Sequence, residues 1–275
     1  MTLASPHRPG PAPEPPARTP PGGAPAPDGY PARIRTFHPR RGRLGARHRD
    51  ALDRLWPAYG LTIPPGPKAW EAGFAGRDAA IGPDPSPELP APLDLAALFG
   101  RRAPVVLEIG FGMGDATAAM AAADPGRDYL AVEVHTPGIA NLLSLVERLG
   151  LTNVRIARGD ALDLLRYMLP PDRLAAVHVF FPDPWPKARH HKRRLIQPAH
   201  VALLRSRLVP GGVLHCATDW AEYAESMLEV LSADPGLVNT YPGYAPRPAY
   251  RPVTKFERRA HRAGRPSFDL IFRRR

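Results

Sequence analysis

The sequence predicts an α/β protein built on a doubly wound, mostly parallel sheet. From residue 105 onward, short apolar runs rich in β-branched and aromatic residues alternate with longer stretches of helical periodicity. Glycine or acidic residues follow several of these runs directly, as expected where a strand turns into a helix. Repeated strand–helix–strand units form parallel crossovers, which place helices on both faces of the sheet.

Composition limits the classes of protein. The chain has 275 residues, of which 44% are hydrophobic, so it can bury a sizeable core. Its net charge of +11 favours a polyanionic partner, nucleic acid first and an acidic membrane surface second. No apolar run reaches the ~18 residues of a membrane span, and the N-terminus lacks the apolar core of a secretory signal. We therefore expect a cytoplasmic protein.

Two segments at the N-terminus differ in character. Residues 1–30 are mostly proline, alanine and glycine, which cannot offset the entropy of ordering, so we expect a disordered tail. Residues 31–60 combine eight arginines with Phe37 and Trp56. This mixture favours a basic arm on nucleic acid over a merely solvated tail, with a helix from Gly45 to Leu55.

The next segment, residues 61–103, is a Pro-rich linker that ends in a short helix near 93–99. Residues 104–275 form the main domain. Apolar runs bounded by glycine, proline or acidic residues predict its strands at 105–109, 129–134, 153–157, 177–181, 213–217 and 267–272. Apolar spacing of three or four residues predicts its helices at 115–123, 137–149, 161–168, 195–208 and 221–231.

A glycine turn joins the first of these strands to its helix. Gly110, Gly112 and Gly114 give G-x-G-x-G, and Asp115 stands where a dinucleotide fingerprint has its third glycine. The phosphate-binding G-K-[S/T] motif is also missing. Glycines at this turn still let a ligand approach the backbone, and Glu108 beside them suits a cationic group better than a pyrophosphate.

Three acids occupy the ends of three successive predicted strands. Glu108 precedes the glycine turn, Glu133 ends the second strand, and Asp160 follows the third. An acid at the end of the second strand typically takes ribose hydroxyls, and Asp160 is placed to accept from an adenine amino group. A ligand with an ammonium group, a ribose and an adenine but no phosphate is S-adenosylmethionine. The pattern favours a methyltransferase.

The fourth strand, 177–181, runs into a proline-rich loop. Asp183 lies between Pro182 and Pro184, which hold the chain extended and prevent a helix from following. Ligands of open α/β sheets bind at this end of the strands. Trp185 comes next, either stacking on a base or serving as a structural tryptophan. An acid, an indole and the following cations suit a nucleobase attached to a phosphate chain.

These motifs resemble one known family. V-L-E-I-G-F-G-M-G, V-E-V-H, F-F-P-D-P-W-P-K-x-R-H-x-K-R-R, A-T-D-W and T-K-F-E-R-R are similar to the tRNA (guanine-N7-)-methyltransferases of the bacterial single-chain type. The match runs from about Arg33 to the C-terminus. It implies a seven-stranded Rossmann-like methyltransferase sheet, S-adenosylmethionine as cofactor, tRNA as partner, no obligate protein partner, and methylation of a variable-loop guanosine.

The resemblance also implies roles for single residues. It assigns cofactor contacts to Glu108, Glu133, Asp160 and Asp183, with Asp183 also catalytic. It assigns substrate contacts to Lys187, Asp219, Thr254, Lys255, Phe256 and Glu257. It assigns tRNA contacts to the basic run Arg189, His190, His191, Lys192, Arg193 and Arg194.

Other readings remain open from the residues alone. An N-methyltransferase acting on DNA or another RNA has a similar acid–proline loop but does not need the T-K-F-E motif. A non-catalytic RNA-binding module of the same fold has no need of the four acids. The histidines and the single cysteine, Cys216, lack zinc spacing, so we expect no metal and no disulfide framework.

Overall fold

The computed structural model describes residues 36–37, 44–64 and 90–275, with the side chains of Lys255 and Phe256 excepted. The predicted tail, 1–30, lies outside these residues, as does most of the arm before residue 44. The proposed division into tail, arm, linker and domain stays a prediction.

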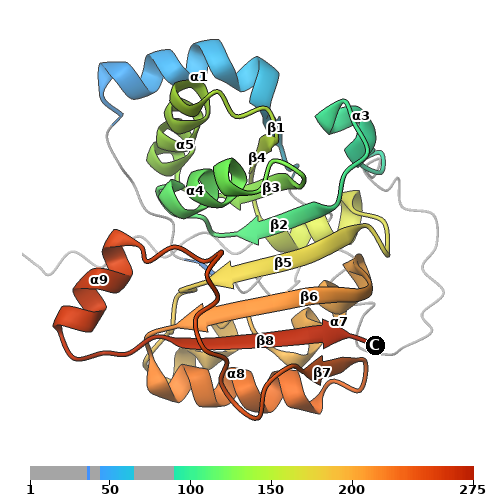
Figure 1. Cartoon of the computed structure of the whole chain (residues 1–275), viewed down its shortest axis with the longest axis vertical. Helices are drawn as coiled ribbons and strands as arrows, with labels where there is room; N and C mark the ends of the chain where they lie inside the picture. Colours follow the sequence, from blue (N-terminus) through green and yellow to red (C-terminus); the bar gives the residue numbers. More distant parts are fainter. Residues whose placement is uncertain (1–35, 38–43, 65–89) are drawn as a thin grey trace, which may run out of the picture. The chain divides into compact units, whose positions relative to one another are not determined.

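An eight-stranded sheet organises the described residues, in the order β1-β4-β3-β2-β5-β6-β8-β7 (Figure 1). The pairs among β1 to β6 are all parallel, whereas β8 runs antiparallel to both of its neighbours. The strands are β1 (Gly60–Thr62), β2 (Val105–Ile109), β3 (Asp128–Glu133), β4 (Val154–Arg158), β5 (Leu174–Phe180), β6 (Leu208–Thr218), β7 (Leu237–Asn239) and β8 (Phe268–Arg274).

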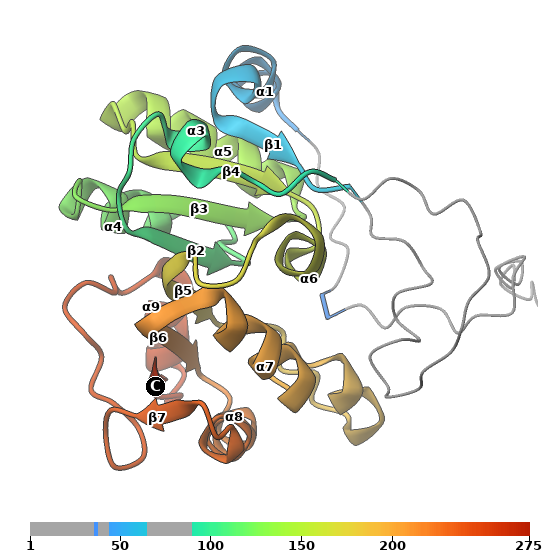
Figure 2. The same ribbon diagram turned by 90° about the vertical axis from the view of Figure 1, so that its right-hand side faces the viewer.

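Helices cover both faces of this sheet (Figure 2). One apolar cluster packs three helices against the first face: α1 (Ala46–Tyr59), α4 (Asp115–Ala123) and α5 (Thr136–Leu149). A second cluster packs the opposite face with α3 (Leu95–Phe99), α6 (Ala161–Asp163), the π-helix η1 (Leu164–Met168), α7 (Pro198–Arg207) and α8 (Ala221–Ala233). The predicted doubly wound α/β fold is therefore confirmed.

The strand count differs from the expected seven because β1 adds an edge strand beside β4. β1 has only three residues and directly follows α1, so it carries too little alternation to be recognised in the sequence. It also begins the segment that was expected to be linker. α7 starts at Pro198, three residues later than predicted, because Leu195 and Ile196 are buried before the helix and Pro198 occupies its first turn.

Three further elements were not predicted. α9 (Lys255–Arg262) is too polar to show an apolar stripe, and β7 is a three-residue strand. The third is η2 (Ala188–Arg193), a short 3-10 helix in a basic run. Among the helices of the described residues, none combines the length and the apolar composition needed to cross a membrane.

Candidate active site

Five acids line one edge of the sheet, at the carboxyl ends of five adjacent strands. In sheet order they are Asp160 after β4, Glu133 at the end of β3, Glu108 in β2, Asp183 after β5 and Asp219 after β6. The chain leaves β2 for β3 on one side, while β5 pairs with β2 on the other. β2 and β5 therefore flank a topological switch point, where open α/β sheets bind ligands.

The glycine turn after β2 leaves space for a ligand. Gly110, Gly112 and Gly114 have φ of 74°, 61° and 79°, a region that other residues rarely adopt. A Cβ atom added at Gly110 or Gly112 meets no atom within 4 Å, so the turn is open above its backbone. A group bound there can come close to the main chain.

The same turn is held from below by α5. A Cβ atom on Gly138 would lie 1.9 Å from the carbonyl oxygen of Gly112, so the helix packs directly on the turn. Sequence reasoning missed Gly138, although a Pro-Gly pair in the first turn of a helix is unusual enough to suggest a close backbone contact.

Glu108 is the buried acid of this site. Its side chain is only 3% exposed, and its Oε2 atom has no hydrogen-bond partner among the described residues. Burial raises the pKa of this carboxyl to about 7, the neighbouring Thr117 hydroxyl opposes the rise, and the charge of Glu133 adds to it. The Thr117 hydroxyl does not meet the geometry of a hydrogen bond to Oε2 in this structure. A buried carboxylate with an unused acceptor is costly unless a cation pairs with it. This environment fits the ammonium group of S-adenosylmethionine.

Backbone amides orient the two neighbouring acids. Glu133 accepts from Gly112 N at 2.9 Å through Oε2, and from Val134 N at 2.7 Å and His135 N at 3.0 Å through Oε1. Asp160 caps α6 by accepting from Leu162 N at 2.9 Å. A carboxylate oxygen has two lone pairs, so Glu133 can accept from a ligand through Oε2 without losing these bonds.

The loop after β5 has an unusual backbone on both sides of Asp183. Phe181 and Trp185 have φ of 52° and 47°, values that are rare for bulky residues. Phe181 N donates to Ala217 O at 2.7 Å, which ties the start of the loop to β6. Such conformations persist only where surrounding structure enforces them, and they cluster at functional sites. The half-buried Asp183 therefore has a fixed position.

Trp185 packs inside the protein. It is 4% exposed, its indole N–H donates to Thr36 O at 3.4 Å, and the Arg193 guanidinium lies 5.0 Å from its ring centre. Of the two readings from sequence, the structure supports the structural tryptophan. The contact also joins the N-terminal arm to the loop that carries Asp183.

The basic run forms a short 3-10 helix, η2 (Ala188–Arg193), and its members differ in exposure. Arg189 and Lys192 are exposed, as is Lys187 just before the helix, whereas His190, His191 and Arg193 are half-buried. The exposed cations are the members of the run that can meet a phosphate backbone.

Arg194 is the buried member of the run. It is 3% exposed, and its guanidinium donates to the carboxylate of Glu222 and to the carbonyl oxygen of Pro184 at 3.0 Å, and it lies over the ring of Tyr223. These contacts give Arg194 a structural role, and its RNA contact stays a prediction. A run of like charges in a sequence does not show which member turns inward.

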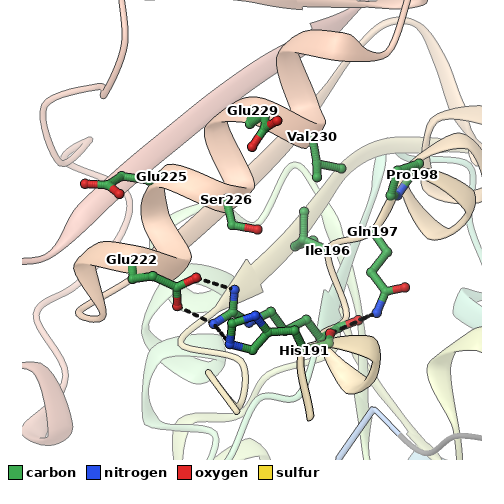
Figure 3. Close-up of a pocket in the computed structure, with 10 residues that line it drawn as sticks. His191, Ile196, Gln197, Pro198, Glu222, Glu225, Ser226, Glu229 and Val230 are labelled. Atoms are coloured by element: carbon green, nitrogen blue, oxygen red, sulfur yellow. Dashed lines mark hydrogen bonds and ion pairs between the residues drawn. The ribbon is translucent and has the colours of Figure 1, made fainter. Parts of the chain in front are cut away.

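A pocket of about 350 Å³ lies between Arg194 and α8 (Figure 3). None of the predicted cofactor-binding residues lines it. Glu222, Glu225 and Glu229 on α8 give it an acidic wall, which does not suit a polyanion. Two of the predicted tRNA contacts, His191 and Arg194, lie on its other side.

The predicted substrate-binding residues near the C-terminus have structural partners. Asp219 accepts from Arg265 Nε at 3.0 Å. Thr254 begins α9 in a capping box, in which its hydroxyl accepts from Glu257 N at 3.1 Å. The side chains of Lys255 and Phe256 lie outside the described residues.

Glu257 is fully buried, and both of its carboxylate oxygens accept from Arg251. Burial alone raises its pKa, but the hydrogen bonds and charge of Arg251 outweigh burial and hold the pKa below its usual range. Glu257 therefore supports Thr254, and its own substrate contact stays a prediction. The described residues contain no cluster of three possible metal ligands, and Cys216 is buried in the core.

Comparisons with known proteins show the family of this chain. Residues 102–270 match a family model described as "Putative methyltransferase". The tRNA (guanine-N(7)-)-methyltransferase of Streptomyces avermitilis is 54% identical over 252 residues, covering 91% of this chain and 78% of that protein. The enzyme of the same name from Nitrosospira multiformis is 54% identical, covering 88% and 94%. Among solved structures, the 16S rRNA methyltransferase KamB matches with a TM-score of 0.49 and 16% identity, over 65% of this chain and 91% of that one. The chain belongs to the tRNA (guanine-N(7)-)-methyltransferase family.

Proposed function

We propose that this protein transfers a methyl group from S-adenosylmethionine to N7 of a variable-loop guanosine in tRNA. The observation that carries the proposal is the buried Glu108, with an unused acceptor beside an open glycine turn. Asp183 stands on the neighbouring strand-end loop, in a chain that belongs to this family.

The residues of three strand ends fit the cofactor. Glu108 pairs with the ammonium group, Glu133 accepts from the ribose hydroxyls, and Asp160 accepts from the adenine amino group. The cofactor supplies an electrophilic methyl group on a sulfonium. The glycine turn keeps side chains away from the space that the cofactor needs.

Asp183 serves the other reactant. Guanine N7 carries a free lone pair, so no base has to remove a proton before attack. Catalysis then rests on orientation and on electrostatic stabilisation of the charge that appears on the imidazole ring. A fixed carboxylate beside that ring complements the charge, and it can also accept from guanine N1–H and the 2-amino group. The constrained loop gives Asp183 the rigidity that either role requires.

The exposed cations next to this loop hold the RNA. Lys187, Arg189 and Lys192 extend from the same segment as Asp183, so phosphate contacts there bring a nucleotide toward the carboxylate. With tRNA as substrate, the enzyme works in the cytoplasm, and the single chain supplies the site without an obligate protein partner.

A knockout strain tests the proposal in the cell. Nucleoside mass spectrometry on tRNA from cells lacking this protein should show loss of 7-methylguanosine, restored by the wild-type chain. Loss of a methylated nucleoside from another RNA or from DNA would instead favour the rival methyltransferase reading. An unchanged nucleoside profile would leave only an RNA-binding module of this fold.

A further inference from the structure

We propose that Arg251 is a positioning residue that holds the loop carrying Asp183 and the first turn of α9 in one fixed arrangement. This inference rests on the proposed function, since it assigns both segments to the same reaction. Arg251 is 1% exposed and precedes α9 by only a few residues. The sequence drew no attention to it, because it resembles the other arginines of a basic segment.

The guanidinium of Arg251 bonds two buried carboxylates at once. It donates to Glu257 through Nη1 at 2.9 Å and Nη2 at 2.8 Å. It donates to Asp269 through Nε at 2.7 Å and Nη2 at 2.8 Å. Only the planar fork of an arginine can make this set of bonds, because a lysine ammonium is a single point donor.

The Glu257 side of the network fixes α9. Glu257 is the third residue of the helix, and its backbone N–H donates to the Thr254 hydroxyl while its side chain accepts from Thr254 N at 3.4 Å. Arg251 thereby determines where the capping box lies. The predicted substrate contact Thr254 follows the position of Glu257.

The guanidinium of Arg251 also contacts the start of the loop that carries Asp183. Its guanidinium carbon lies 5.5 Å from the ring centre of Phe181 and 5.8 Å from that of Phe180. These distances are typical of cation–π contacts. Phe181 has φ of 52° and stands two residues before Asp183. Arg251 thus packs on the residue whose backbone directs the loop.

The Asp269 side anchors the network to the sheet. Asp269 belongs to β8 and also accepts from His215 Nε2 on β6 at 2.7 Å. The other ring nitrogen of His215 lies 2.8 Å from the Tyr250 hydroxyl, next to Arg251 in sequence. Two neighbouring strands therefore hold the Asp269 carboxylate, and this carboxylate holds Arg251. The Asp183 loop and the first turn of α9 are thus both linked to the sheet.

The test substitutes Arg251→Lys, which keeps the charge but loses the fork. Arg101→Lys is the matched control, because Arg101 also donates through two nitrogens to a buried carboxylate, Asp128, at the start of β3 and away from the site. Two quantities are measured for each variant. The first is the kinetics of methyl transfer to tRNA, with kcat expressed per cofactor-binding site as counted by calorimetry, together with KM. The second is the rate of hydrogen exchange of the α9 amides.

Arg251→Lys should lower kcat roughly 100-fold, the effect of a displacement of about 1 Å at a reacting centre. It should leave cofactor affinity unchanged and speed hydrogen exchange in α9. Arg101→Lys should change neither kcat nor the exchange in α9. A purely stabilising role would reduce the number of binding sites but not kcat per site. Wild-type kcat per site, or unchanged exchange in α9, would overturn the inference.

Glu257→Gln gives a second route if the arginine variant does not fold. It keeps the shape of the side chain and weakens its bonds to Arg251, so kcat should again fall and exchange in α9 should rise. If the wild-type protein does not methylate tRNA, the proposed function fails by that result alone. The exchange measurement then still decides whether Arg251 fixes α9.

Discussion

Glu108 combines burial with an unused acceptor, and its protonation state therefore governs what it can bind. Its pKa is raised to about 7, chiefly by burial. Below that pH the carboxyl is largely protonated in the folded protein, and the proton must leave before the carboxylate can pair with an ammonium group. Cofactor affinity should consequently fall as the pH drops through 7.

Calorimetry checks this between about pH 5.5 and about pH 7, where an α-amino group stays largely protonated. With a pKa of about 7, the ionised fraction of Glu108 rises from about 3% to about 50% over that interval, so the dissociation constant should tighten roughly 15-fold. Glu108→Gln should bind more weakly at pH 7 and lose this dependence. A wild-type affinity that is flat over the interval would show that Glu108 does not carry the ion pair.

The positions of the three predicted cofactor-binding acids could be read from the sequence because they follow from where strands end. The carboxyl ends of parallel strands lie at the same edge of a sheet, so Glu108, Glu133 and Asp160 are placed together at that edge. Burial within a polar run does not follow from such a pattern. Arg194 turns inward to Glu222, which is distant along the chain, and Glu257 turns inward to Arg251, which nothing in the sequence marks as its partner. Only the folded structure shows these pairs.

At the scale of elements, the contact between α5 and the glycine turn fixes the floor of the site. Gly138→Ala places a Cβ atom 1.9 Å from Gly112 O, so the turn or the helix must move. Overpacking of this kind costs about 1–3 kcal/mol. We expect cofactor affinity to fall while the rest of the fold persists, as measured by calorimetry and circular dichroism.

Gly126→Ala is the matched control for this prediction. A Cβ atom at Gly126 makes only an ordinary contact, 3.5 Å from an oxygen of Asp124. This variant should bind the cofactor as the wild type does. Equal affinities for Gly138→Ala and Gly126→Ala would mean that the turn adjusts freely and does not depend on α5.

Predictability also differed between elements. Strands β2 to β5 and helices α4, α5 and α8 came from apolar runs between clear turn residues, and they lie close to their expected bounds. β6 begins at Leu208, five residues before its predicted start, because the Pro-Gly-Gly segment expected to be a turn belongs to the strand. β1 and β7 have three residues each, too few for a pattern. α9 has no apolar stripe because its order depends on a capping box and on a buried arginine, which local periodicity cannot show.

At the scale of the whole molecule, the net charge of +11 predicts binding that weakens with salt. Reversing Arg189 and Lys192 to glutamate should weaken tRNA binding and flatten its salt dependence. Each lost phosphate contact should reduce the log–log slope by roughly 0.7 to 0.9. Titrations at several salt concentrations measure this slope.

Arg173→Glu serves as the control, because Arg173 is equally exposed but lies at the amino end of β5, away from the site. It removes one positive charge and adds one negative charge without touching the proposed surface. The Arg173 variant could lower the slope as much per reversed charge as the double variant of Arg189 and Lys192 does. That result would mean that the exposed cations of η2 do not contact the tRNA specifically.

Methyl transfer in a purified system shows whether this protein methylates N7 of a tRNA guanosine by means of Asp183. The protein is incubated with cofactor carrying a deuterated methyl group and with unmodified tRNA, and the nucleosides are analysed by mass spectrometry. The account predicts labelled 7-methylguanosine, at most one per tRNA, which disappears with Asp183→Ala although cofactor and tRNA still bind. Label in a different nucleoside, no label at all, or a normal rate with Asp183→Ala would contradict it.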